Sequence, residues 1–401
     1  MNDGPHLHFV FKVASRCNLN CSYCYVYNKG DSTWRERPAI MDDEVVEIAI
    51  HRIRRHCQAT GQSYLTITFH GGEPCLVKQE RFSSWCRKIK EGLSGVARVQ
   101  LCMQTNGTLL DDGWAEIIKR FDIDLGISID GTPEVHDALR VDHAGRGSYR
   151  DVEQGLAVLR RAGIPLRFLS VIQLGASGAA VHRHLTSLGP ASIDYLLPDF
   201  THDTIAAVRD RYGPTPCADF LIPIFEDWWR DGTLDLRIKI FWNIAWLVQG
   251  GESRIDMLGN QPLTFLFVNT DGEIEGLDVL RVCYDGAART GLNVRTSDFM
   301  DVRHAGEFHR AAVFEGMPLP DGCRACRERD TCAGGYLPHR YASRTGFNNP
   351  TVWCADLLKL FDHVRERLGT SVEETKLRRA HLLDTALRRA VGLQQESPAI
   401  G

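Results

Sequence analysis

Apolar runs and amphipathic segments alternate along the first half of the chain. Short apolar runs typical of buried strands lie at residues 7–14, 65–69, 99–103, 124–129, 166–172 and 193–197. Between them, apolar residues recur with a helical period at residues 45–57, 82–93, 112–121, 149–162 and 178–188. Residues suited to helix N-caps precede three of these segments: Asp42 or Asp43, Asp111 or Asp112, and Ser177. This order predicts parallel strands joined by helices.

Polar residues directly follow five of the predicted strands: Cys17, Glu73, Asn106, Asp130 and Asp199. In a (β/α) barrel these positions share the face on which active sites lie. Six strand–helix units are too few for a closed barrel of eight strands. The pattern therefore predicts an α/β fold with an open, partial (β/α)6 barrel of TIM-like type.

The pattern changes after residue 199. It predicts helices at 220–229, 240–249, 355–368 and 372–393, a hairpin at 265–275 around Asp271-Gly272, and a loose tail at 394–401. A cysteine-rich segment at 323–354 separates the hairpin from the last helices. We therefore expect four parts: the partial barrel at 1–210, a helical bridge at 211–262, a cysteine-rich domain at 263–360, and C-terminal helices and tail at 361–401.

The composition is that of a globular protein, with 43% hydrophobic and 24% charged residues. The net charge of −4 gives no sign of nucleic-acid binding or of a polybasic membrane anchor. We find no run of 18 apolar residues and no signal peptide, so we expect a cytoplasmic protein with neither membrane nor nucleic-acid partners. Thirteen cysteines in such a protein favour metal or redox chemistry over disulfides.

Three closely spaced cysteines follow the first predicted strand, in the pattern Cys17-x3-Cys21-x2-Cys24. Three thiols in one tight loop cannot all form disulfides with one another. A structural zinc site normally needs four protein ligands, and no fourth Cys or His lies nearby. Three thiolates suit a [4Fe–4S] cluster with one open iron. Such an iron could take the amino and carboxylate groups of S-adenosylmethionine (SAM).

A second set of cysteines lies in the C-terminal half: Cys323, Cys326, Cys332 and Cys354. Four thiolates suffice for a closed site, and their spacing alone allows either zinc or an iron–sulfur cluster. The remaining cysteines are scattered, mostly in apolar surroundings, and we expect them to be structural: Cys57, Cys75, Cys86, Cys102, Cys217 and Cys283.

The first cysteine loop, with Tyr23 before its last cysteine, resembles the signature of radical SAM enzymes. Gly71-Gly72-Glu73-Pro74 is similar to the family's GGE motif, which contacts the methionine amine. The segment from Ser128 to Arg140 resembles the one whose Ser and Arg hold the SAM carboxylate and ribose. The resemblance implies SAM contacts at Tyr23, Tyr25, Gly71, Gly72, Glu73, Gln104, Asn106, Ser128, Asp130 and Arg140. Plainer roles stay open, namely turn capping by Gln104 and Asn106, packing by Tyr25, and a surface charge at Arg140.

The second cysteine set looks like a SPASM or twitch-like C-terminal domain, which carries auxiliary iron–sulfur clusters, and this resemblance favours iron–sulfur over zinc. The family usually has seven cysteines and two auxiliary clusters, one cysteine following the hairpin. Here residues 271–278 contain no cysteine, and Cys283 has the wrong spacing. We therefore expect one auxiliary cluster and two [4Fe–4S] clusters in all.

Residues 290–294, 332–341, 346–350 and 354–357 resemble the FxsB-type subfamily. This resemblance implies a maturase that takes a hydrogen from a ribosomally made precursor peptide and joins an aromatic ring to a neighbouring side-chain carbon, a cyclophane. It also implies an external electron donor such as a flavodoxin or ferredoxin. The alternatives are a sulfatase-maturase-like enzyme that oxidises one Cys or Ser, and a thioether-forming maturase. A non-enzymatic iron–sulfur carrier would need no SAM pocket.

Asp199 follows the sixth predicted strand and could act as the base of the reaction, although it could equally cap its loop. The first predicted strand begins at residue 7, so we expect no N-terminal leader-binding domain.

Overall fold

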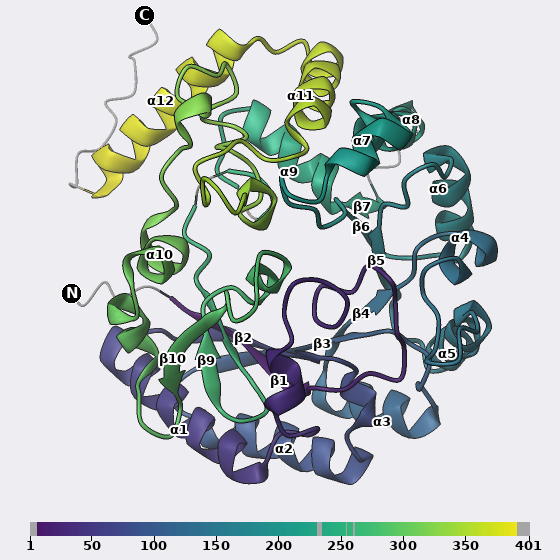
Figure 1. The fold of residues 1–401 in the computed structure, drawn as a ribbon. Coiled ribbons are helices and arrows are strands. Elements are labelled where there is room, and N and C mark those ends of the chain that lie inside the picture. Colours follow the sequence, from purple (N-terminus) through teal and green to yellow (C-terminus); the bar gives the residue numbers. More distant parts are fainter. Residues whose placement is uncertain (1–5, 231–234, 254, 260, 391–401) are drawn as a thin grey trace, which may run out of the picture.

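The computed structural model describes residues 6–230, 235–253, 255–259 and 261–390. Within these residues, one ten-stranded sheet has the order β10-β9-β8-β1-β2-β3-β4-β5-β6-β7 (Figure 1). Its strands are β1 (His8–Ala14), β2 (Tyr64–Gly71), β3 (Arg98–Thr105), β4 (Asp124–Ser128), β5 (Arg167–Val171), β6 (Ser192–Leu196), β7 (Arg237–Ile238), β8 (Phe265–Val268), β9 (Glu273–Glu275) and β10 (Arg289–Asn293).

Strands β1 to β6 are parallel neighbours in chain order, as predicted for a partial barrel. The helices between them lie along the outside of the curved sheet (Figure 1). The helices are α1 (Asp43–Thr60), α2 (Gln79–Gly92), α3 (Asp112–Phe121), α4 (Pro133–Asp137), α5 (Tyr149–Arg161), α6 (Gly178–Ser187), α7 (Ala206–Tyr212), α8 (Pro216–Arg230), α9 (Lys239–Val248), α10 (Glu307–Arg310), α11 (Cys354–Leu368) and α12 (Val372–Ala390). This arrangement confirms the predicted fold class and leaves the carboxyl ends of the strands facing one side.

The predicted helix starts have a local cause. The side chain of Asp111 accepts a hydrogen bond from the backbone N–H of Trp114 at the start of α3, and Ser177 does the same for Ala180 in α6. Asp42 occupies the N-cap position of α1, but its side chain makes no capping bond.

The predicted hairpin forms, since β8 and β9 pair antiparallel. Strand β8 also pairs in parallel with β1, and β10 pairs with β9, so the hairpin extends the sheet of the barrel. The sheet is therefore continuous across the boundary that we expected between residues 262 and 263. The two-residue strand β7 and the strand β10, which contains Gly291, have too little apolar pattern to be predicted.

Most buried apolar side chains form one core between the sheet and its helices. A second, smaller core is formed mainly by the segment that follows β9. It consists of Leu277, Val279, Leu280, Val282, Ala287, Ala288, Ala312 and Leu337. No helix among the described residues is long and apolar enough to span a membrane. The end of the helix predicted at 372–393 and the tail predicted at 394–401 lie outside the described residues.

Candidate active site

A cavity of about 290 Å³ opens at the carboxyl ends of the barrel strands. The two halves of the chain both contribute to its wall. Of the residues singled out in the sequence, the wall contains Cys17, Cys21, Tyr23, Cys24, Tyr25, Gly71, Gly72, Gln104, Asn106, Ser128, Arg140 and Asp199. It also contains residues that the sequence did not single out, among them Tyr27, His70, Asp256, Asp278 and Tyr336. The predicted end of the barrel is therefore where the predicted site residues meet.

The three thiols of the first cysteine loop face this cavity together. Burial raises the pKa of each thiol, that of Cys17 to about 12, and the charges of neighbouring cysteines add to the shift of Cys17. The backbone N–H of Leu19 and the side-chain amide of Asn106 point at the sulfur of Cys17, at 3.4 and 3.7 Å. Buried thiols held by such donors lose their protons most readily to a bound metal.

Glu73 lies behind the cavity and not in its wall, so its expected SAM contact stays a prediction. Its side chain is completely buried. Its carboxylate accepts hydrogen bonds from the backbone N–H groups of Cys75 and Asn106, at 2.9 and 2.8 Å, and from the hydroxyl of Thr105, at 2.7 Å. Glu73 therefore ties the end of β2 to the end of β3 and has no exposed oxygen for an ammonium group.

Gly71 and Gly72 are required by the chain's own packing. A Cβ on Gly71, whose φ is +136°, would lie 2.2 Å from the carbonyl oxygen of Ala14. A Cβ on Gly72 would lie 2.0 Å from the carbonyl oxygen of Arg16. Real Cβ atoms do not approach other atoms this closely, so the two glycines allow the cysteine loop to pass directly over β2.

Arg140, Tyr23 and Asp130 form a buried polar group beside the thiols. The hydroxyl of Tyr23 donates to Asp130, and Nη1 of Arg140 donates to that hydroxyl, each at 2.5 Å. Asp130 also accepts hydrogen bonds from Val171 and Gln173 and lies behind the wall, so its expected SAM contact stays a prediction. Arg140 itself lies in the wall, and its buried Nε–H has no hydrogen-bond partner among the described residues.

Two further buried polar atoms of wall residues have no partner within the described part of the chain, namely the hydroxyl of Tyr27 and Nδ1 of His70. Buried polar atoms are nearly always hydrogen-bonded, so such atoms around one cavity indicate a polar ligand. The free N–H of Arg140 suits a carboxylate, and three thiols suit a cluster with one open iron. The residues present therefore fit a [4Fe–4S] cluster with SAM bound to it.

The opposite side of the cavity is built around Asp278, at the start of a short 3₁₀ helix (Asp278–Val282) after β9. Its Oδ2 lies 2.5 Å from Nζ of Lys12 and accepts a 2.7 Å hydrogen bond from the hydroxyl of Tyr25. Lys12 and His70 lower the pKa of Asp278 and outweigh the opposing effect of its burial. Asp278 is therefore an ionised carboxylate in the cavity wall.

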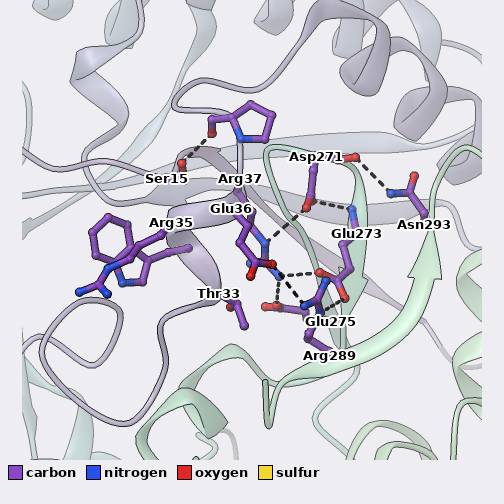
Figure 2. Close-up of polar contacts among 12 residues, drawn as sticks. Ser15, Thr33, Arg35, Glu36, Arg37, Asp271, Glu273, Glu275, Arg289 and Asn293 are labelled. Atoms are coloured by element: carbon purple, nitrogen blue, oxygen red, sulfur yellow. Dashed lines mark hydrogen bonds and ion pairs between the residues drawn. The ribbon is translucent and has the colours of Figure 1, made fainter. Parts of the chain in front are cut away.

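Buried ion pairs fix the loop after β1 to the hairpin that leads to Asp278. Figure 2 shows Arg37 reaching from this loop to the hairpin, where its Nη2 lies 2.6 Å from Glu273 and 2.9 Å from Glu275. Further along, Arg281 pairs with Glu275 and with Asp31 of the loop. These contacts hold the segments of Tyr25 and Asp278 in a constant relation to each other.

Asp199 lies in the wall as predicted, and its Oδ1 is 3.1 Å from Nε2 of the buried His339. The ring of His339 packs edge-on against Tyr336, another wall residue. The structure therefore places Asp199 between the cavity and the cysteine-rich segment, and its role as a base stays a prediction.

The four C-terminal cysteines, Cys323, Cys326, Cys332 and Cys354, line one small cavity. Burial raises the pKa of Cys332, and the other three thiols add to this shift. Cys283 lies elsewhere, and its pKa is raised by burial and by Asp199 and Asp203. Four grouped thiols fit a second [4Fe–4S] cluster, in which each thiolate binds a different iron.

Among the described residues, no three or more His, Cys, Asp or Glu side chains converge closely enough to hold a single metal ion. A cluster does not require such convergence, because its ligands are spread over several irons.

The loop with three of these cysteines is fixed to the helix with the fourth. The Glu328 carboxylate makes two hydrogen bonds to Arg365 of α11, at 2.8 and 2.9 Å. Its backbone carbonyl accepts the N–H of Cys332 at 2.8 Å. This buried pair therefore orients the cysteine loop towards Cys354, at the start of α11.

Residues 11–186 match the family model of the Radical SAM superfamily. The chain is 24% identical over 374 residues to the cysteine-type anaerobic sulfatase-maturating enzyme of Clostridium perfringens, covering 91% of this chain and 98% of that one. It is 26% identical over 392 residues to the serine-type anaerobic sulfatase-maturating enzyme of Bacteroides thetaiotaomicron, covering 88% of each chain.

Two solved structures show the same fold. Native anSMEcpe with bound AdoMet superposes with a TM-score of 0.75 at 21% identity, over 90% of this chain and 98% of that one. Streptococcus suis SuiB bound to the precursor peptide SuiA superposes with a TM-score of 0.54 at 14% identity, over 84% of this chain and 72% of that one.

Proposed function

We propose that this chain, a radical SAM enzyme, oxidises a single Cys or Ser side chain of a peptide substrate. The likeness to both cysteine-type and serine-type sulfatase-maturating enzymes over most of the chain supports this activity. It corresponds to the first alternative drawn from the sequence. The comparisons support this alternative better than the cyclophane crosslink that we expected first, so we do not propose that crosslink here.

Cys17, Cys21 and Cys24 would hold the cluster that binds SAM, with Arg140 beside the SAM carboxylate. Cys323, Cys326, Cys332 and Cys354 would hold one auxiliary cluster. When bound, these groups supply a radical that removes a hydrogen atom and an acceptor for one electron, with the starting electron coming from an external donor such as a flavodoxin or ferredoxin. The protein must bind the peptide, orient it, exclude water and accept a proton.

The proton acceptor that the geometry favours is Asp278. Converting a CH₂–OH group into an aldehyde removes one hydrogen atom, one electron and one proton. A CH₂–SH group loses the same three and gives a thioaldehyde, which water hydrolyses to the aldehyde with release of hydrogen sulfide. A base for this proton must be ionised before the reaction and must reach the substrate. Asp278 meets both conditions, because Lys12 and Tyr25 hold its carboxylate and it lines the cavity.

The single observation that carries this proposal is the shared cavity. It brings three thiols and the unpaired N–H of Arg140 from the barrel to one side, and the carboxylates of Asp199, Asp256 and Asp278 to the other. A peptide side chain entering between them would have a radical source on one side and a base on the other. A simple iron–sulfur carrier has no use for such an arrangement.

The proposal can be tested with peptides that carry one Cys or one Ser with deuterium on its Cβ. We expect deuterium to appear in 5′-deoxyadenosine and the peptide to be oxidised only when the enzyme and SAM are both present. Asp278→Asn should lower peptide oxidation about a hundredfold, since a positioned base contributes on that order.

Asp199→Asn is the matched variant at another carboxylate of the cavity wall. A larger loss of oxidation in Asp199→Asn than in Asp278→Asn would assign the base to Asp199. Deuterium-free 5′-deoxyadenosine with every Cys and Ser peptide would contradict the proposed function.

A further inference from the structure

Lys12 is a charged residue in β1, a strand whose residues are mostly buried. Its side chain is 6% exposed, and both sequence neighbours, Phe11 and Val13, are completely buried. Moving an ammonium group out of water is costly unless a partner compensates the charge. A lysine at this position therefore needs a reason that packing alone does not supply.

The position of the Lys12 charge gives that reason. Its Nζ lies 2.5 Å from Oδ2 of Asp278, which is its only ion-pair partner in the described part of the chain. It also lies 5.5 Å from the ring centre of Tyr25 and 5.9 Å from that of Phe267. Asp278 belongs to the cavity wall and Lys12 does not. The Lys12 ammonium therefore contacts the Asp278 carboxylate from the side that faces away from the cavity.

The other charges nearby are occupied with one another. Arg281 pairs with Glu275 and Asp31, and Arg37 pairs with Glu273 and Glu275. Lys12 and the Tyr25 hydroxyl both bind the same oxygen, Oδ2, of Asp278. This leaves Oδ1 for another partner.

We propose that Lys12 is a positioning residue that keeps Asp278 ionised and turned so that its carboxylate accepts the proton of the oxidised substrate. This inference rests on the proposed function. Bound SAM would supply the radical that takes the substrate hydrogen atom, and a bound auxiliary cluster would supply the acceptor for the electron, which leaves the proton for Asp278. Lys12 does not touch the substrate in this scheme.

The pH dependence of the step follows from the groups that interact with Asp278 from each neighbouring element: Lys12, Tyr25, His70, Arg281 and Tyr336. Glu275 acts on the charge of Lys12. With Lys12 present, the pKa of Asp278 stays below its ordinary value, and the base remains ionised throughout the neutral range. Without Lys12, burial would dominate and raise that pKa. The acid limb of peptide oxidation would then move to higher pH.

The test compares Lys12→Met, which has similar bulk without the charge, with Lys12→Arg, which keeps the charge. The control is Lys88→Met on helix α2, where Lys88 forms an exposed ion pair with Glu47 of α1. For Lys12→Met we expect the ratio of oxidised peptide to 5′-deoxyadenosine to fall about tenfold or more. The kcat of peptide oxidation should fall with it, while the KM for the peptide should change little. We expect partial rescue in Lys12→Arg and no change in Lys88→Met.

A second measurement does not depend on activity. In Lys12→Met the raised pKa of Asp278 should make the thermal midpoint of the reconstituted protein fall as the pH rises through that pKa. In the parent, Asp278 contributes stability above its unfolded pKa and loses it only in acid, so it adds no slope near neutral pH. The double variant Lys12→Met/Asp278→Asn, which contains no unpaired charge at this site, should lose the new slope.

The outcomes separate the two proposals. If the parent enzyme oxidises no Cys or Ser peptide, the proposed function fails, whatever Lys12→Met shows in the thermal measurement. If the parent oxidises peptide but Lys12→Met keeps its coupling ratio, pH profile and thermal slope, the role of Lys12 is wrong. If Lys12→Met does not fold, the second charge-removing variant Lys12→Gln takes its place. A parent-like coupling ratio and pH profile in folded Lys12→Gln would overturn the inference.

Discussion

Replacing Glu328 by Gln should release the auxiliary cysteine loop from α11. Glu328 lies between Cys326 and Cys332, and its carboxylate binds Arg365 through two oxygen atoms. The side chains of Glu328 and Arg365 are 0% and 8% exposed. Arg365 also donates to the hydroxyl of Thr375 and the carbonyl of Ser371, at 2.6 and 3.1 Å. The substitution keeps the shape of residue 328 but leaves the Arg365 charge without its counter-ion.

The size of the effect follows from this burial. Removing one partner of a buried ion pair costs about 3–5 kcal/mol, because the remaining charge is left uncompensated. An exposed pair in the same two elements provides the comparison. Arg327 of the cysteine loop and Asp362 of α11 are 2.6 Å apart and each 52% exposed. Asp362→Asn should therefore cost only about 0–1 kcal/mol.

The assay uses anaerobically reconstituted protein and measures the thermal unfolding midpoint and the bound iron of each variant. Glu328→Gln should lower the midpoint several times more than Asp362→Asn and should release up to roughly half of the iron. The double variant Glu328→Leu/Arg365→Leu should regain most of the midpoint, since no charge stays buried. Equal midpoints and equal iron in Glu328→Gln and Asp362→Asn would refute this account of the loop.

Three further predictions concern the first cluster. Arg140→Lys keeps the charge but loses the unpaired Nε–H, so SAM titration should show about ten- to a hundredfold weaker binding; unchanged affinity would place the SAM carboxylate elsewhere. Gly72→Ala should prevent cluster assembly because its Cβ would lie 2.0 Å from the carbonyl oxygen of Arg16. Gly322→Ala, whose Cβ would have no contact closer than 3.9 Å, should be tolerated. Equal bound iron in the two variants would contradict this role of Gly72. The parent should bind about eight irons, and replacing the cysteines of the first loop by Ala should remove about half of them and all SAM cleavage. Twelve irons, or stoichiometric zinc, would contradict this count.

Local patterns made the barrel predictable. Each strand of the first half is an apolar run, and Asp111 and Ser177 stand directly before the helices that they cap. The three thiols of the first site lie within eight residues of sequence, so their meeting requires no long-range information. The auxiliary cysteines were predictable as a set, because their spacing is also mostly local.

The remainder of the site depends on contacts between distant segments. Tyr25 and Asp278 are 253 positions apart and meet only because β8 pairs with β1. The orientation of Glu73 could not be predicted because its three donors come from the ends of β2 and β3, and a motif does not show which way a carboxylate turns. Lys12 did leave a signal, since it is the one charged residue in the apolar run at 8–14. A lone charge in a buried strand suggests a buried partner but does not identify it.

The most direct test of the central claim is the chemistry of the peptide product. The reconstituted enzyme would be incubated with SAM, a low-potential reductant and a peptide that contains one Ser or one Cys, and the product would be treated with a hydrazide and analysed by mass spectrometry. We expect a product that carries one new carbonyl at the Ser or Cys, forms a hydrazone, and appears together with 5′-deoxyadenosine. A product lighter by two hydrogens that forms no hydrazone and holds two side chains together would contradict the claim and would restore the crosslinking activity first expected from the sequence.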